Sequence, residues 1–117
     1  MKVRLQVVLY LLLFPVMSMA GTCNSISCFG KIDMLYPHGG NGNIYIQMEG
    51  IQLTENTAAL NCTLFDGKFI VLKQTNKLHS EIYSMLLSAT VANKDLKLRI
   101  VEASPDCELI YTTLSGG

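Results

Sequence analysis

The four cysteines are the residues of this chain with the most definite chemistry. They stand at Cys23, Cys28, Cys62 and Cys107. An even number of cysteines is typical of disulfides when a small domain is exported, and the first 20 residues indicate export, so we expect two disulfides. A zinc site is the alternative, but the sequence has no Cys-x-x-Cys pair, and His38 and His79 stand far apart in the expected elements. We therefore expect neither a metal nor another cofactor.

A catalytic site would need a nucleophile and a base within hydrogen-bond reach of each other. The consecutive residues His79, Ser80 and Glu81 offer suitable side-chain types. However, neighbouring residues on a helix point in different directions, and His38 stands in a glycine-rich turn without a partner. The sequence therefore predicts that the protein is not an enzyme.

A sugar-binding site usually combines an aromatic side chain with nearby hydroxyl or amide groups. The chain has no tryptophan, but two such pairs face outward on expected strands: Tyr45 with Gln47, and Tyr111 with Thr113. These four residues are the candidate ligand-binding residues. The alternative is that the tyrosines are half-buried residues of the sheet, as tyrosines often are.

The first 20 residues have the layout of a cleavable signal peptide. Lys2 and Arg4 precede an apolar run over 7–14, and small residues end the segment at Ala20, after which we expect cleavage. An uncleaved anchor is the alternative, but Pro15 breaks the run, which is shorter than the roughly 20 residues of a membrane-spanning helix. We expect a secreted or periplasmic protein.

Removing 20 of the 117 residues leaves 97, which is the size of one small domain, over 21–117. The whole chain has nine basic and nine acidic residues; without Lys2 and Arg4 it has seven and nine, a net charge of minus two. This balance argues against nucleic acid or an anionic membrane as the main partner.

A single helix followed by a strand is expected between residues 78 and 100. Apolar residues first recur every three or four positions and then alternate, so the helix ends near Ala92 and a strand covers 96–100. Thr75 or Asn76 can cap the helix start, and Asn93 can adopt the left-handed conformation at its end. The expected buried residues are Leu78, Ile82, Met85, Leu86 and Ala89 on the helix, and Leu96, Leu98 and Ile100 on the strand.

Four further strands are expected, over 31–36, 44–49, 68–73 and 108–114. Glycines and asparagines in 37–43 predict a hairpin between the first two. Ile32, Met34 and Tyr36 would share one face of the first strand. The preceding segment, 21–29, is short and polar, and we expect a loop there.

The order strand, strand, strand, helix, strand, strand is that of the OB-fold, a mainly β, five-stranded Greek-key barrel with one helix. In that barrel the first strand pairs with the second and fourth, and the third with the fifth. Cys62 and Cys107 would then lie at the same end of neighbouring strands, which favours pairing them and leaves Cys23 with Cys28. A bond between Cys28 and Cys107 is also compatible with the order.

Three segments, Cys28–Ile32, Asn43–Gly50 and Leu86–Ile100, together with Cys107, resemble the B subunits of Shiga-type and subtilase-type bacterial toxins. The resemblance implies a homopentamer that binds host glycans and accompanies a separate catalytic subunit. The chain is also similar to small exported proteins of unassigned role.

These observations lead to one expected function and one alternative. The first is an exported, disulfide-bonded module that binds a receptor or glycan as a homo-oligomer. The alternative is a stand-alone periplasmic protein-interaction module with no glycan or toxin role.

Overall fold

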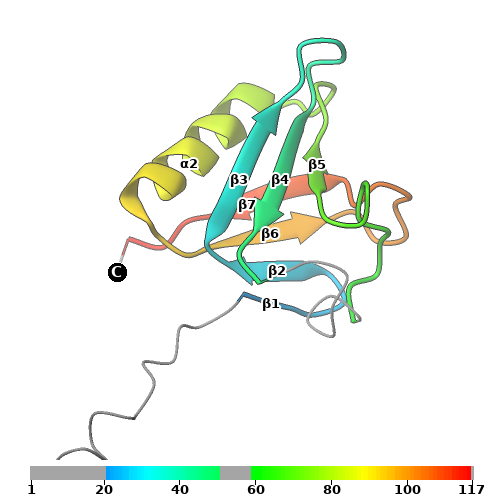
Figure 1. Cartoon of the computed structure of the whole chain (residues 1–117), viewed down its shortest axis with the longest axis horizontal. Helices are drawn as coiled ribbons and strands as arrows, with labels where there is room; N and C mark the ends of the chain where they lie inside the picture. Colours follow the sequence, from blue (N-terminus) through cyan, green and yellow to red (C-terminus); the bar gives the residue numbers. More distant parts are fainter. Residues whose placement is uncertain (1–20, 51–58, 117) are drawn as a thin grey trace, which may run out of the picture.

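The computed structural model describes residues 21–50 and 59–116. The expected signal peptide lies outside these residues, as does part of the connection before residue 60. In chain order the elements are β1 (Thr22–Cys23), β2 (Ser27–Gly30), β3 (Ile32–Pro37), β4 (Ile44–Met48), β5 (Ile70–Leu72), α2 (His79–Ala92), β6 (Leu96–Ile100) and β7 (Leu109–Thr113) (Figure 1). In the described part, the expected mainly β fold with one long helix is confirmed.

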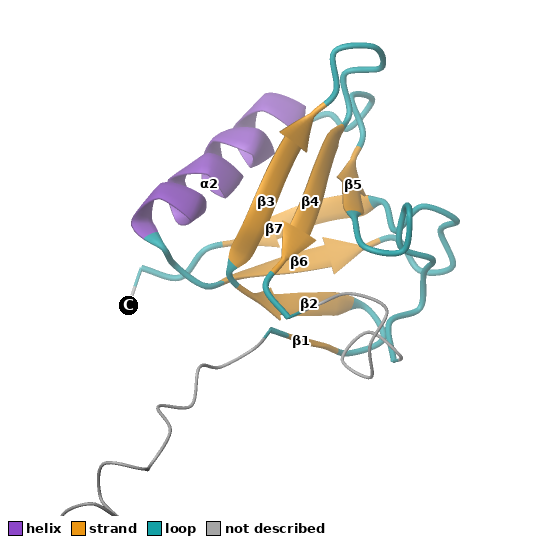
Figure 2. Cartoon of the chain, in the orientation of Figure 1, coloured by secondary structure: helices purple, strands orange, loops and turns teal. Residues whose placement is uncertain are grey.

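The strands form two antiparallel sheets, one in the order β1-β2-β6-β7 and one in the order β3-β4-β5 (Figure 2). The expected hairpin is confirmed as the β3–β4 pair. A parallel bridge between Val71 of β5 and Glu108, beside β7, connects the two sheets. Among the described residues no ladder closes the sheets into one cylinder, so the five-stranded barrel is not confirmed.

The segment expected to be a loop, 21–29, instead forms β1 and most of β2. The Asn24 side chain organises the reversal between them, since its Oδ1 accepts hydrogen bonds from the backbone N–H groups of Ile26 and Ser27. β2 then pairs with β6, so the backbone N–H and C=O groups of β2 form hydrogen bonds within the sheet. Gly30 adopts a φ of 155°, which favours glycine, where the chain passes from β2 to β3.

A β-bulge in β3 reverses the expected faces of this strand. The register against β4 shifts between Ile32 and Met34, so that one extra residue is inserted there. Ile32 is buried, whereas Met34 and Tyr36 are 46% and 47% exposed, and Leu35 packs against the core. The expectation that Ile32, Met34 and Tyr36 share one face is therefore wrong.

The core lies between the inner faces of both sheets and α2. The helix contributes Ile82, Leu86 and Ala89, while β6 contributes three buried residues, as expected. Met85 is half-buried. Leu78 is exposed, contrary to the expectation, because the helix begins at His79 and Leu78 lies before its first turn.

An asparagine lies near each end of α2, but only Asn93 caps the helix. Asn93 takes the left-handed conformation, with φ 54° and ψ 47°, which confirms the expected helix end. Asn76 does not cap the first turn: its Oδ1 accepts from the N–H of Leu78, and its Nδ2 donates to the carbonyl oxygens of Leu109 and Ile110. Asn76 therefore attaches the start of the helix to β7.

Both disulfides have the favoured pairing. One joins Cys23 to Cys28, which lie opposite each other on β1 and β2, and the other joins Cys62 to Cys107. The Cys28–Cys107 alternative is therefore wrong. Disulfides of this kind are typical of oxidising compartments. Within the described residues, no helix combines the length and apolar character needed to cross a membrane.

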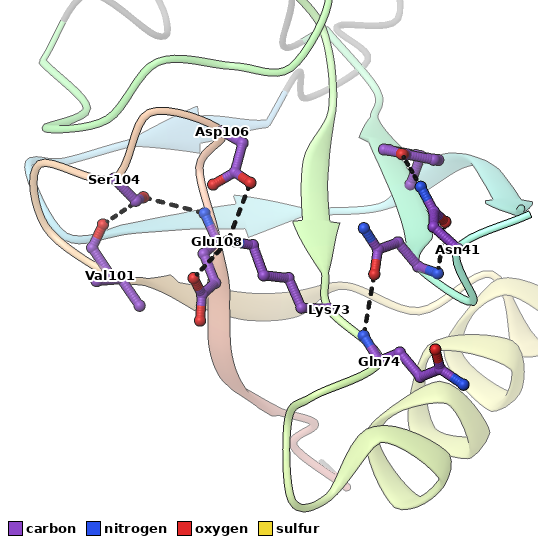
Figure 3. A network of polar contacts seen from close by, with 9 residues as sticks. Asn41, Lys73, Gln74, Val101, Ser104, Asp106 and Glu108 are labelled. Carbon is purple, nitrogen blue, oxygen red and sulfur yellow. Dashed lines mark hydrogen bonds and ion pairs between the residues drawn. The ribbon is translucent and has the colours of Figure 1, made fainter.

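An ionic cluster ties the end of β5 to the start of β7 (Figure 3). Lys73 Nζ lies 3.1 Å from Glu108 Oε1 and 3.2 Å from Asp106 Oδ2. Hydrogen bonds to Glu108 and then Asp106 raise the pKa of Lys73 above its ordinary value. Ser104 fixes the adjoining turn, since its hydroxyl donates to the Val101 carbonyl and accepts from the Glu108 N–H.

Candidate ligand groove

The outer face of the β3-β4-β5 sheet carries an open groove of about 430 Å³. Its floor is mainly aromatic and its rim is polar. The residues that line it are Met34, Tyr36, His38, Tyr45, Phe65, Asp66, Lys68 and Phe69. We call it the aromatic groove.

The floor of the aromatic groove follows from the register of the sheet. Tyr36 of β3 lies directly opposite Tyr45 of β4, and Tyr45 lies opposite Val71 of β5. The two tyrosine rings have their centroids 5.5 Å apart. Aromatic pairs that face each other across strands stabilise a sheet, so this row supports both the fold and the groove.

A tight reversal before β5 brings a third ring onto this row. Phe65 and Phe69 exchange two backbone hydrogen bonds of 2.9 Å, and the turn between them uses positive φ angles at Asp66 and Gly67. The Phe65 ring stacks on Tyr45 with centroids 4.8 Å apart. Phe65 nevertheless remains 44% exposed, so it offers its other side to a ligand.

This reversal explains why Tyr45, one of the candidate ligand residues, is buried. Tyr45 and Gln47 are each only 6% exposed. Tyr45 lies beneath Phe65 and against Phe69, so it forms part of the groove floor and cannot act as a freely exposed platform. Gln47 does not line the groove.

The other two candidates, Tyr111 and Thr113, are exposed on β7. This strand belongs to the other sheet, so the structure does not bring the two candidate pairs together. The exposed aromatic residues of the groove, Tyr36 and Phe65, were not among the candidates. Tyr36 alternates with core-like residues in the sequence, and Phe65 precedes its strand.

The rim of the aromatic groove offers several hydrogen-bonding groups. His38 Nδ1 accepts a hydrogen bond from the Gly40 N–H at 3.1 Å, so a neutral His38 ring carries its proton on Nε2. Asn41 Nδ2 donates to the Tyr45 hydroxyl, which leaves the hydroxyl proton available for donation. Lys68 Nζ lies 5.3 Å from the centroid of the Phe69 ring.

The hairpin that carries His38 is held against α2 and the segment before it. His79 Nε2 lies 2.9 Å from the Gly42 carbonyl oxygen. The Gln74 N–H donates to Asn43 Oδ1 at 3.0 Å (Figure 3). His79 is half-buried and contacts the hairpin.

These features suit a ligand that is apolar on one side and rich in hydroxyl groups at its edge. Exposed rings can stack on the C–H face of a sugar, while the rim can bind hydroxyls. The Asp66 carboxylate and the Lys68 ammonium compensate each other, so the rim does not select for a charged ligand.

No protein-family model, no curated protein and no solved structure matches this chain.

Proposed function

We propose that this protein is an exported binding module, and not an enzyme, that takes an uncharged saccharide in the aromatic groove. The observation that carries the proposal is that two exposed rings, Tyr36 and Phe65, line one groove whose rim contains His38, Asp66 and Lys68. The two disulfides support a secreted or periplasmic location, where a domain of this size benefits from covalent cross-links.

We also propose that the fold is an open relative of the OB-fold barrel. Three pairings support this assignment. β3 pairs with β4, and β2, which leads into β3, pairs with β6. The Val71–Glu108 bridge then brings β5 beside β7 in parallel orientation.

Substitutions in the aromatic groove test the proposed function. Tyr36→Ala and Phe65→Ala each remove an exposed ring. Each is expected to weaken saccharide binding roughly tenfold, because the variant loses one aromatic contact and the apolar area that this contact buries. An array of uncharged oligosaccharides identifies a ligand, and isothermal titration calorimetry then compares the variants with the parent protein.

Tyr111→Ala is the matched control, because it removes an exposed tyrosine from the outer face of the other sheet. It is expected to bind the same oligosaccharide as the parent does. The proposed function is wrong if no oligosaccharide on the array binds, or if the two groove variants retain full affinity.

The homo-oligomer is the second part of the proposal. Leu87 and Val91 lie one turn apart on α2 and are both exposed, which is unusual for large apolar residues on a helix that already buries another face. We expect light scattering to give a mass of several chains, and we expect Leu87→Lys combined with Val91→Lys to reduce it to one. A parent protein that is monomeric at high concentration would contradict this part alone.

A further inference from the structure

The outer face of the β1-β2-β6-β7 sheet carries a second set of aromatic and polar side chains, which we call the basic face. Its members are defined by the register of the four strands. Thr22, Phe29, Lys97 and Thr113 form one row across the sheet, and Ser27, Arg99 and Tyr111 form the next. Side chains directly opposite each other in such rows have their Cβ atoms about 5 Å apart.

The residues between these rows show which way the basic face points. Cys28, Leu98 and Thr112 alternate with them along the strands and are buried. Phe29 and Tyr111, in contrast, are 52% and 40% exposed. Because alternate residues of a strand point to opposite sides, the basic face is turned away from the core.

Within residues 21–50 and 59–116, both cations of the basic face are without a carboxylate partner. Lys31 and Lys73 each form ion pairs with acidic residues, but Lys97 and Arg99 form none among the described residues. Neither row contains an acidic residue. In addition, Arg99 Nε is buried and has no hydrogen-bond partner in the described part of the chain, which is unfavourable for a guanidinium group.

The surface is hollowed beside Phe29. A hollow of about 300 Å³ is lined by Phe29, Lys97 and Thr22, and by Ser27, which is 5% exposed and donates its hydroxyl to Asn24 Oδ1. It therefore combines an exposed ring, an ammonium group and the Thr22 hydroxyl within one small concavity. This combination can hold one sugar unit together with its acidic substituent.

We propose that the basic face binds an acidic polysaccharide, whose carboxylate or sulfate groups contact Lys97 and Arg99 and whose sugar rings stack on Phe29 and Tyr111. The positive charge of this face complements the negative charge of the ligand, even though the chain without the expected signal peptide carries more acidic than basic residues. The site lies on a different sheet from the aromatic groove, and the inference does not depend on the function proposed for that groove.

The number of cations favours a saccharide over two other polyanions. Proteins that bind nucleic acids mainly through phosphates usually neutralise about six to ten of them. Binding to anionic membranes typically involves clusters of about four to eight basic residues. Two cations beside two aromatic rings suit a ligand with sparser charge and an apolar ring face.

Three polysaccharides test the inference by isothermal titration calorimetry at low ionic strength. Heparin supplies sulfates, polygalacturonate supplies carboxylates alone, and dextran is the uncharged control. We expect heparin, polygalacturonate or both to bind, and we expect Lys97→Ser to leave any binding of dextran unchanged. Lys97→Ser combined with Arg99→Gln is expected to reduce the affinity for the acidic polysaccharide at least tenfold. Phe29→Ala is expected to reduce the same affinity severalfold.

Three controls make the result specific. Lys77→Ser removes another exposed lysine, away from the two rows, and is expected to bind as the parent does. Tyr36→Ala, in the aromatic groove, is likewise expected to retain heparin affinity. If the double variant melts at a lower temperature than the parent, Lys97→Ser alone, at an exposed position, provides the comparison, with a loss of at least threefold expected.

Several outcomes would overturn the inference. One is that neither acidic polymer binds, and another is that the Lys97 variants bind as tightly as the parent. A loss of heparin binding in Tyr36→Ala would place the acidic ligand in the aromatic groove. Equal affinity for a single-stranded oligonucleotide of the same charge would show a general attraction to polyanions.

Discussion

Replacing Leu86 with aspartate is expected to abolish cooperative folding of the domain. Leu86 is 0% exposed and lies on α2 between the inner faces of the two sheets. The substitution removes a buried leucine and places a carboxylate among the apolar residues of the core. Together these losses are comparable with the whole stability of a small domain, about 5 to 15 kcal/mol.

An exposed residue of the same helix provides a matched control. Ser84 is exposed on α2 and lies outside the apolar pair formed by Leu87 and Val91, so Ser84→Asp is expected to change the free energy of unfolding by less than about 1 kcal/mol. Urea unfolding followed by circular dichroism compares the two variants. A cooperative transition in Leu86→Asp, similar to that of the parent protein, would contradict the helix face described here.

Loss of the Cys62–Cys107 disulfide is expected to destabilise the domain about twice as much as loss of the Cys23–Cys28 disulfide. The paired cysteines are 45 residues apart in the first case and 5 in the second. If a disulfide acts mainly by restricting the unfolded chain, these loops correspond to roughly 4 and roughly 2 kcal/mol. The longer cross-link also fixes the segment before β5 to the segment before β7.

Paired substitutions separate the two contributions. Cys62→Ala with Cys107→Ala, and Cys23→Ala with Cys28→Ala, each remove one cross-link without leaving a free thiol. Both pairs contain one fully buried cysteine, Cys107 or Cys28, so the local packing losses are similar in kind. Urea midpoints and slopes give the free energies; a larger loss from the Cys23–Cys28 pair would contradict the prediction.

The helix and the strand after it could be predicted because their burial follows directly from sequence period. Ile82, Leu86 and Ala89 repeat at helical spacing, and the leucines and isoleucine of β6 alternate. Asn93 marks the change between them. These elements depend on local spacing, which a sequence displays.

The faces of β3 could not be predicted because a bulge is set by the partner strand. Ile32, Met34 and Tyr36 alternate regularly in the sequence, yet the register shift turns the last two outward. The opposite error occurred at Tyr45, which alternates like a surface residue and is covered by Phe65. Both errors concern contacts between segments that are distant in the sequence.

The aromatic groove has the same origin. Tyr36 reaches the surface through the bulge, and Phe65 reaches Tyr45 through the reversal at Asp66 and Gly67. Neither residue is near the other in the sequence, and the spacing of either one gives no sign of a site. Tyr111 was correctly expected to be exposed. That Arg99 lies beside it could not be predicted, because this contact depends on the pairing of β7 with β6.

The contact between Asn76 and β7 has a consequence for behaviour in concentrated solution. Outer strands with unoccupied backbone groups invite other chains to add to a sheet, which is a route to fibrils. β7 is one edge strand of the larger sheet, and the Asn76 amide donates hydrogen bonds to the carbonyl oxygens of its residues Leu109 and Ile110. β1 is the other edge strand; it is only two residues long and is cross-linked to β2 by a disulfide. Each edge strand therefore offers few free backbone groups for fibril growth.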